Sequence, residues 1–231
     1  MKTKWLTGLV LLQNSGQQEV PMKAIIFDLD GVICFTDKYH YMAWKRMADE
    51  IGVYFDEIIN NRLRGVSRMD SLDIILERAT KKYAQDEKEE LAEQKNAYYV
   101  ELLKNMSPQD LSTEIKSTLN ELRDRGYQLA IGSSSKNTKM ILKQIGLDNY
   151  FDAISDGTNI VHSKPDPEVF LKAAEFLSLK PKECLVVEDA LAGIEAAYKG
   201  GFKSAGIGEA ATHEHVTYVI KHFSDLLDFM R

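Results

Sequence analysis

Near its start the chain reads Ala24-Ile25-Ile26-Phe27-Asp28-Leu29-Asp30-Gly31, four apolar residues followed by a turn signal that carries two acids. A short apolar run without polar alternation is typical of a strand that is buried on both faces. Such strands occur in parallel sheets that helices cover on both sides. We therefore predict that residues 24–27 form an inner strand of an α/β sheet, with Asp28 and Asp30 following its carboxyl end.

From residue 109 onward the pattern alternates between helix and strand. Apolar residues spaced three and four apart predict helices at 114–125, 137–145, 167–177 and 190–199. Short apolar runs predict strands at 127–132, 151–155, 184–187 and 202–207. This alternation predicts right-handed crossovers and a doubly wound, mainly parallel sheet.

The segment between the first strand and this alternating region has a different character. Residues 38–105 are rich in Lys, Glu and Gln, and helical spacing of apolar residues recurs at 41–51, 71–82 and 87–103. We predict an inserted α-helical cap at 36–108 and an α/β core made of 22–35 and 109–231.

Residues 1–21 are predicted to be an extension outside the folded core. Lys2 and Lys4 precede the short apolar run 5–12, but residues 13–18 offer no convincing small-residue cleavage site. We interpret the segment as a disordered extension or leader, and an export signal is the alternative. No other segment approaches the roughly 18 apolar residues of a membrane span.

Charge and cysteine content narrow the class of protein. The 35 acidic and 29 basic residues give a net charge of -6, which argues against nucleic acid or an anionic membrane as the main partner. Cys34 and Cys184 lie in apolar, strand-like runs, so we expect reduced core residues and a reducing, cytoplasmic location.

Polar side chains follow each predicted strand, where ligands bind in open α/β sheets. These residues are Asp28 and Asp30, Ser133 to Lys136, Ser163 and Lys164, and Glu188 with Asp189. Clustered carboxylates call for a hard divalent cation, and Mg²⁺ suits a site that also takes phosphate oxygens. Lys164 and Ser133 would then meet the charge of a transferring phosphoryl group.

The two acids that follow the first strand could have different catalytic roles. On a regular strand, Asp28 and Asp30 would face the same way, so one could attack phosphorus while the other handles protons. Each motif also has a purely structural interpretation. Glu188 and Asp189 could cap the next helix, and the serines could form a polar turn.

These motifs resemble those of the haloacid dehalogenase-like (HAD) phosphotransferases. Asp28-Leu29-Asp30-Gly31-Val32 is similar to the first motif, and Ser133, Lys164 and Glu188-Asp189 match the next three in order, over residues 22–231. The resemblance implies a Rossmann-like core, Asp28 as nucleophile and Asp30 as general acid/base. It further implies that Ser133 and Lys164 hold the phosphoryl group, and that Asp28, Asp189, the Asp30 carbonyl and Glu188 hold Mg²⁺.

Within that superfamily the chain resembles the β-phosphoglucomutases, through strings such as Gly65-Val66-Ser67-Arg68, Lys95-Asn96 and Ser133-Ser134-Ser135-Lys136-Asn137. This resemblance implies conversion of β-glucose 1-phosphate to glucose 6-phosphate, with β-glucose 1,6-bisphosphate as intermediate and activator, by a monomer. The substrate-binding residues that it implies are Thr36, His40, Trp44, Arg64, Gly65, Val66, Ser67, Arg68, Lys95, Ser135, Lys136 and Asn137.

Two other functions fit the same motifs. The first is a phosphatase for a sugar phosphate or another small phosphomonoester, and the second is a catalytically silent phosphosugar-binding regulator. Two departures from the family pattern matter: the first removes one possible oxygen near the metal, and the second bears on local geometry. Ala190 stands where relatives often have a small hydroxyl residue, and Leu111-Ser112-Thr113-Glu114 lacks the usual Pro-Gly before the helix.

Overall fold

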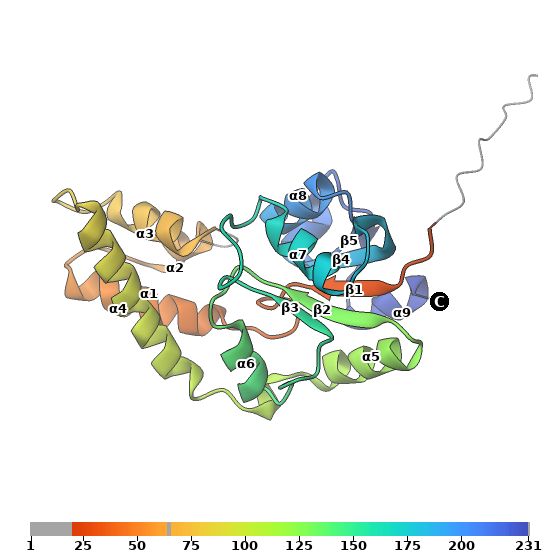
Figure 1. Ribbon diagram of the computed structural model, residues 1–231. Helices are drawn as coiled ribbons and strands as arrows, with labels where there is room; N and C mark the ends of the chain where they lie inside the picture. Colours follow the sequence, from red (N-terminus) through yellow and green to blue (C-terminus); the bar gives the residue numbers. More distant parts are fainter. Residues whose placement is uncertain (1–19, 64–65, 231) are drawn as a thin grey trace, which may run out of the picture.

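The computed structural model describes residues 20–63 and 66–230, which form a parallel β-sheet flanked by helices and a separate group of helices. The sheet has six strands in the order β3-β2-β1-β4-β5-β6, and each neighbouring pair is parallel (Figure 1). Their bounds are β1 Ala24–Phe27, β2 Gln128–Gly132, β3 Ala153–Ser155, β4 Cys184–Glu188, β5 Lys203–Gly206 and β6 Tyr218–Val219. The predicted doubly wound parallel sheet is confirmed.

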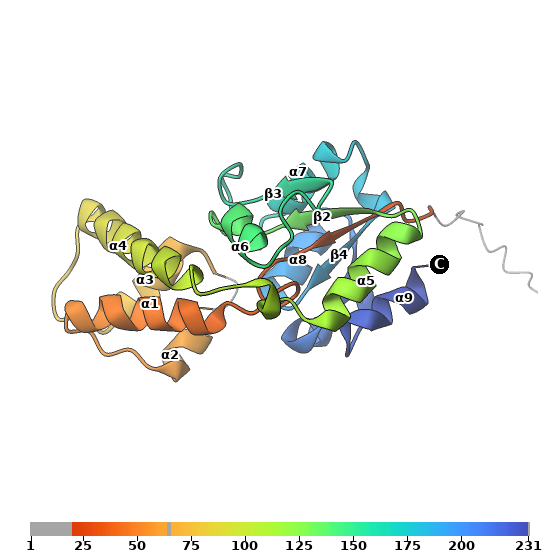
Figure 2. The same ribbon diagram turned by 90° about the horizontal axis from the view of Figure 1, so that it is seen from below.

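Helices cover both faces of the sheet because alternate residues of the strands point to opposite sides. Ile25 and Phe27 of β1 join the cluster beneath α5 (Thr113–Asp124), α6 (Thr138–Gln144) and α9 (Leu226–Phe229). Ala24 and Ile26 join the cluster beneath α7 (Glu168–Phe176) and α8 (Leu191–Lys199). The two layers of helices are seen above and below the strands in Figure 1 and from below in Figure 2.

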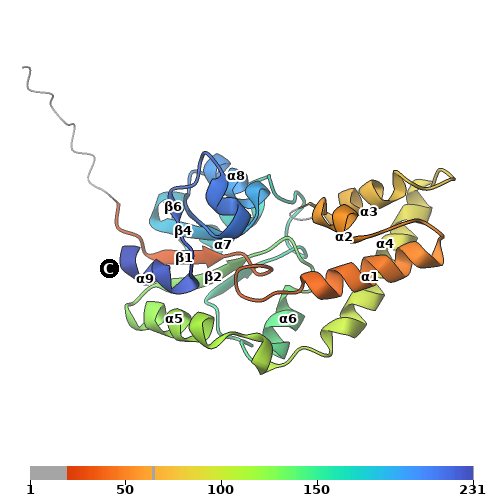
Figure 3. The ribbon, with the colours of Figure 1, turned by 180° about the vertical axis from the view of Figure 1, so that it is seen from behind.

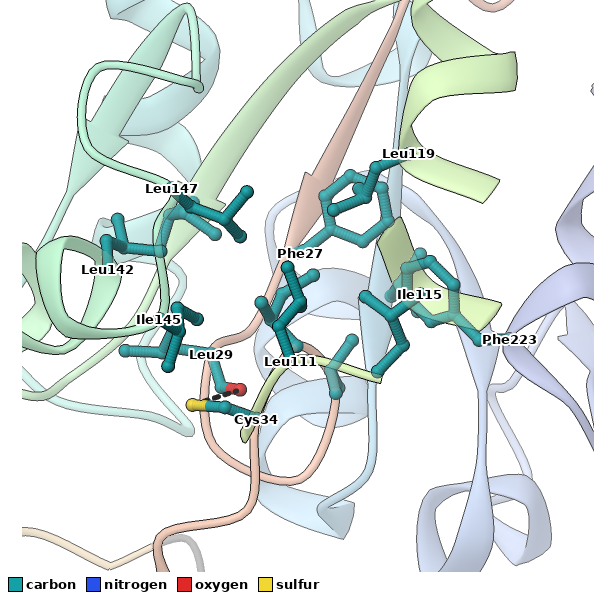
Figure 4. Packing of buried hydrophobic residues seen from close by; sticks show 14 of the residues in the cluster. Phe27, Leu29, Cys34, Leu111, Ile115, Leu119, Leu142, Ile145, Leu147 and Phe223 are labelled. Atoms are coloured by element: carbon teal, nitrogen blue, oxygen red, sulfur yellow. Dashed lines mark hydrogen bonds between the residues drawn. The ribbon is translucent and has the colours of Figure 1, made fainter. Parts of the chain in front are cut away.

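Phe27, the last residue of β1, anchors the larger cluster (Figure 4). Its ring is fully buried, and its centroid lies 5.6 Å from that of Phe223 and 6.4 Å from that of Phe151. These aromatic contacts fix the end of β1 directly before Asp28, so packing in the core sets the position of the functional loop.

The remaining helices form a unit of their own beside the sheet, which we call the helical cap. It contains α1 (Asp37–Glu50), α2 (Glu57–Asn61), α3 (Arg68–Leu76) and α4 (Gln85–Leu103), all inserted between β1 and β2. Figure 3 shows this unit standing clear of the helices that cover the sheet. The cap has its own buried cluster, which includes Trp44, Met47, Phe55, Leu72 and Ile75.

The expected helix at 71–82 begins and ends earlier than its apolar pattern indicated. The Ser67 side chain accepts a hydrogen bond from the Asp70 amide at 3.2 Å and caps the helix, which therefore begins at Arg68, three residues before the first expected position. After Leu76 the chain turns tightly, as Ala79 N donates to Leu76 O at 3.0 Å. The short elements α2 and β6 were not predicted, since two to five residues give too little periodicity.

Two further expectations concern the cysteines and the membrane. Cys34 and Cys184 are both buried free thiols, as predicted for core residues. Among the described residues, no helix combines the length and the apolar character that crossing a membrane requires. The proposed extension lies almost entirely outside the described residues, which begin at residue 20.

Replacing Phe27 by Ala should lower the free energy of unfolding by about 3–5 kcal/mol, because a fully buried ring is removed and a cavity remains. Urea unfolding followed by circular dichroism measures the change. Phe176→Ala is the matched control, since that ring is 51% exposed and its loss should cost about 1 kcal/mol or less. Equal losses for the two variants would contradict this account of the core.

Candidate functional site

One cavity of about 910 Å³ lies at the carboxyl ends of the strands, between the sheet and the helical cap. Strand β1 has β2 on one side and β4 on the other, so this is where the strand order changes direction. The cavity lining includes all six core residues singled out in the sequence, which are Asp28, Asp30, Ser133, Lys164, Glu188 and Asp189. Segments more than a hundred residues apart in the chain therefore meet as expected.

The Lys164 ammonium lies between two carboxylates at the floor of this cavity. It forms ion pairs with Asp28, from the loop after β1, and with Glu188, the last residue of β4. All three side chains are buried. Burial alone would lower the pKa of Lys164, but Asp28 and Glu188 raise it above its usual range, so the ammonium stays charged.

Two glycines allow the acids to approach this closely. A Cβ on Gly31, which has φ +89°, would lie 2.0 Å from Asp189 Oδ2. A Cβ on Gly193, in α8, would lie 1.9 Å from the Glu188 carboxyl carbon. Since real Cβ contacts of that length do not occur, only glycine at each position lets Asp189 and Glu188 occupy their places.

Burial and mutual repulsion raise the pKa values of the acids. Burial is the main cause for Asp28, where Lys164 opposes the rise and Glu188 and Asp189 add to it. For Asp189, burial followed by repulsion from Glu188 raises the pKa to about 7. The cluster therefore carries more negative potential than a single ammonium compensates, which favours binding of a further cation.

The donor set fits Mg²⁺, since the carboxylates of Asp28, Glu188 and Asp189 and the backbone carbonyl of Asp30 are all hard oxygen donors. Within the described residues, no three His, Cys, Asp or Glu side chains are grouped closely enough to hold a metal ion, and Lys164 lies between Asp28 and Glu188. Glu188 also accepts a hydrogen bond from Ala190 N at 2.9 Å, so the helix-capping interpretation holds in part for this acid.

Asp30 lies outside the strand, in contrast to the regular extension of β1 assumed from the sequence. Strand β1 ends at Phe27, and Asp30 sits in a tight loop that bridges to Cys34. Burial raises the pKa of Asp30 to about 6, and a hydrogen bond from Thr36 opposes this rise. A carboxyl group with a pKa near neutrality can both give and take a proton.

Thr36 is a predicted substrate-binding residue whose hydroxyl contacts Asp30. Its side chain is fully buried and does not line the cavity. The Thr36 hydroxyl donates to Asp30 Oδ1 and accepts from Tyr99 Oη at 3.0 Å. Tyr99, on α4 of the cap, was not singled out in the sequence, where it is one apolar position in a helical pattern.

The cap side of the cavity carries basic groups. Lys95 Nζ lies 2.9 Å from His40 Nδ1 and packs over the rings of Trp44 and Tyr99. Burial, and then the charge of Arg68, lower the pKa of Lys95 to about 7. Burial and these two cations also lower the pKa of His40, which is therefore neutral at physiological pH.

The other predicted substrate-binding residues divide into two groups. Val66, Ser67, Arg68, Ser135, Lys136 and Asn137 line the same cavity as His40, Trp44 and Lys95. Arg64 and Gly65 lie outside the described residues. A further lining residue, Asn96, accepts hydrogen bonds from both Arg68 and Asn137 at 3.0 Å. Asn96 follows Lys95 in one of the strings that carry the family resemblance, but no role was predicted for it because its side chain is uncharged.

Comparisons with known proteins agree with this fold. A family model described as haloacid dehalogenase-like hydrolase matches residues 22–201. A β-phosphoglucomutase of Bacillus subtilis is 41% identical over 207 residues, which cover 89% of this chain and 92% of that protein. A phosphorylated carbohydrates phosphatase of Thermotoga maritima is 31% identical, covering 80% of this chain and 82% of that one. A crystal structure of a Clostridium difficile β-phosphoglucomutase superposes with a TM-score of 0.82 at 39% identity, covering 89% and 93% of the two chains.

The buried Lys95 predicts an unusual dependence of stability on pH. Its folded pKa of about 7 lies below the value of an exposed lysine, so its protonated form destabilises the folded state. That penalty is fully present below about pH 7 and fades as pH rises toward the unfolded pKa of about 10.4. Lys95→Met should therefore raise the free energy of unfolding more at about pH 6 than at about pH 9, by on the order of 2–3 kcal/mol.

Chemical denaturation of both proteins at the two pH values measures this difference. Lys116→Met, an exposed position on α5, is the control and should change stability by the same small amount at each pH. A gain for Lys95→Met that does not vary with pH would show that the ammonium is not destabilising.

Proposed function

This chain belongs to the haloacid dehalogenase-like hydrolase family, and on that premise we propose that it is a phosphomutase that interconverts β-D-glucose 1-phosphate and glucose 6-phosphate. The reaction would pass through an aspartyl phosphate on Asp28 and through β-glucose 1,6-bisphosphate, which also serves as activator. The 41% identity to the Bacillus subtilis β-phosphoglucomutase, over nearly the full length of both chains, supports this choice.

The observation that carries the proposal is that the cavity is lined by two groups of residues that could contact phosphate. Asp28, Lys164 and Ser133 form the first group, where a phosphoryl group would be transferred. Arg68 and Asn137 form the second group and meet through Asn96. A molecule that carries phosphate on two sides of a sugar ring would contact both groups at once, whereas hydrolysis of a monophosphate needs only the first.

In the first half-reaction we propose that a carboxylate oxygen of Asp28 attacks phosphorus of the bisphosphate. The bond from phosphorus to the sugar oxygen breaks, and Asp30 gives its proton to that oxygen. After the monophosphate turns round or exchanges, its free hydroxyl attacks the aspartyl phosphate and Asp30 takes the proton back. A pKa of about 6 for Asp30 suits both directions.

The residues proposed to hold Mg²⁺ are Asp28, Asp189, Glu188 and the carbonyl of Asp30. When bound, the ion would neutralise charge that develops on the transferring phosphoryl oxygens. Lys164 and the Ser133 hydroxyl would contact the same group. Lys164 already neutralises Asp28 and Glu188, so its ammonium would turn partly toward the phosphoryl oxygens as they arrive.

The helical cap gives this chemistry its selectivity in our proposal. An aspartyl phosphate reacts with water, so a mutase must exclude water while it admits a sugar hydroxyl. Closure that depends on gripping the far phosphate would meet this need, and the Arg68 guanidinium is suited to the grip. The substrate is a small phosphosugar, and we propose that one chain forms a complete site.

A phosphatase for sugar phosphates is the second candidate, because a phosphatase is among the relatives and the core acids suit hydrolysis equally well. The basic cap residues favour the mutase. Incubation with β-glucose 1-phosphate, Mg²⁺ and a trace of the bisphosphate separates the two. We expect glucose 6-phosphate, detected by a coupled dehydrogenase assay. Release of free phosphate without glucose 6-phosphate would identify the phosphatase instead.

Asp30→Asn should lower kcat by about 10²–10⁴-fold, because the amide can neither donate nor accept the transferred proton. Mg²⁺ binding should persist, since the proposed ligand from this residue is the backbone carbonyl. Steady-state kinetics and calorimetric Mg²⁺ titration measure the two effects. Asp124→Asn, at an exposed site on α5, is the control. A near-normal rate for Asp30→Asn would remove the acid/base role.

A further inference from the structure

Asn96 joins the cap to the core through a single oxygen atom. Its Oδ1 accepts a hydrogen bond from Arg68 Nη2 at 3.0 Å and a second from Asn137 Nδ2 at 3.0 Å. Arg68 is the first residue of α3 and Asn96 lies on α4, both in the cap, whereas Asn137 precedes α6 in the core. The guanidinium has only donors, so the amide oxygen and not its nitrogen must face Arg68.

The side chain of Asn137 gives up its usual local partner to reach Asn96. An Asn at this position normally accepts a hydrogen bond from the helix backbone, which stabilises the start of the helix. Asn137 occupies the N-cap of α6 but makes no such bond. Instead, its amide extends across the gap between core and cap. The Asn137 side chain thus makes a hydrogen bond between core and cap, and makes none that would stabilise the start of α6.

Because Asn96 is uncharged, the positive charge of Arg68 stays available for an anionic ligand. Among the described residues, no carboxylate forms an ion pair with Arg68; burial lowers the pKa of its guanidinium, and the nearby charge of Glu93 only partly opposes this. An amide oxygen orients the guanidinium through one N–H and leaves its charge and its other donors free. A carboxylate in the same place would neutralise that charge before any anionic ligand arrived.

We propose that Asn96 is a positioning residue that holds Arg68 and Asn137 ready, one from each side of the gap, for the far phosphate of the substrate. This inference rests on the proposed function and deepens it, since it names the residue that sets the preference for sugars with a phosphate remote from the reacting one. Asn96 acts through its two partners and not on the reacting atoms.

Asn96→Asp is the sharpest variant, because it keeps the shape of the side chain and changes only its charge and its amide nitrogen. The new carboxylate would pair with Arg68 and repel a phosphate. We expect KM for β-glucose 1-phosphate to rise about ten-fold or more, with kcat at saturation changed by less than about three-fold. Hydrolysis of acetyl phosphate, which has no far phosphate, should stay within about two-fold of wild type.

Asn105→Asp is the matched control, because it makes the same chemical change at an exposed position just after α4. It should alter neither substrate's kinetics. In an Arg68→Ala background, Asn96→Asp should have little further effect on KM, since the positioned group is already missing. A general disturbance of the cap would instead lower both activities with or without Arg68. Thermal melts of each variant verify folding.

The outcomes separate this inference from the proposed function. If wild type forms glucose 6-phosphate but Asn96→Asp behaves like Asn105→Asp, the positioning role is wrong and the mutase stands. If wild type releases only free phosphate, the mutase is wrong, and the KM for the same sugar phosphate still tests Asn96. Equal losses on β-glucose 1-phosphate and acetyl phosphate would also overturn the positioning role.

Discussion

The ion pairs of Lys164 with Asp28 and Glu188 are the interaction on which the site depends. Three carboxylates line one cavity where β1 and β4 end, in surroundings that exclude most water. Burial, and then repulsion from Glu188, raises the free energy of the ionised forms of Asp28 and Asp189. One buried ammonium offsets part of that repulsion and leaves the cluster still attractive to a divalent cation. Loss of the ammonium would leave uncompensated charge in the core, which is strongly destabilising.

This charge balance is possible only because the backbone is close-packed around it. Gly31 and Gly193 admit Asp189 and Glu188 at distances that any side chain would block. Phe27 holds the end of β1 against Phe223, so the loop that carries Asp28 begins from a rigid point. The positions of the acids are thus set by apolar packing and by the absence of a Cβ atom at Gly31 and Gly193, as much as by the acids' own interactions.

The sequence predicted the residues that lie at the ends of strands, because strand order and chain order bring them to one edge of a parallel sheet. Asp28, Ser133, Lys164 and Asp189 were found in this way. It could not predict contacts that cross between the cap and the core, since these depend on how two separately packed units face each other. The hydrogen bond from Thr36 to Asp30 was therefore not foreseen, and no role was predicted for Asn96, although it follows Lys95 in a family string, because the sequence does not show which residues its amide faces.

The cap and the core differ in how their buried charged side chains are paired. In the core, acids are paired with a lysine and keep residual negative potential. In the cap, Arg68 is bound to a neutral amide and lies near Lys95, whose pKa it helps to lower after burial has done so. The two cations repel each other when no anion is present, and burial adds to this cost. In the function that we propose, the far phosphate would contact Arg68 on the cap and Asn137 on the core. Its binding energy would then be available to hold the two units together during transfer.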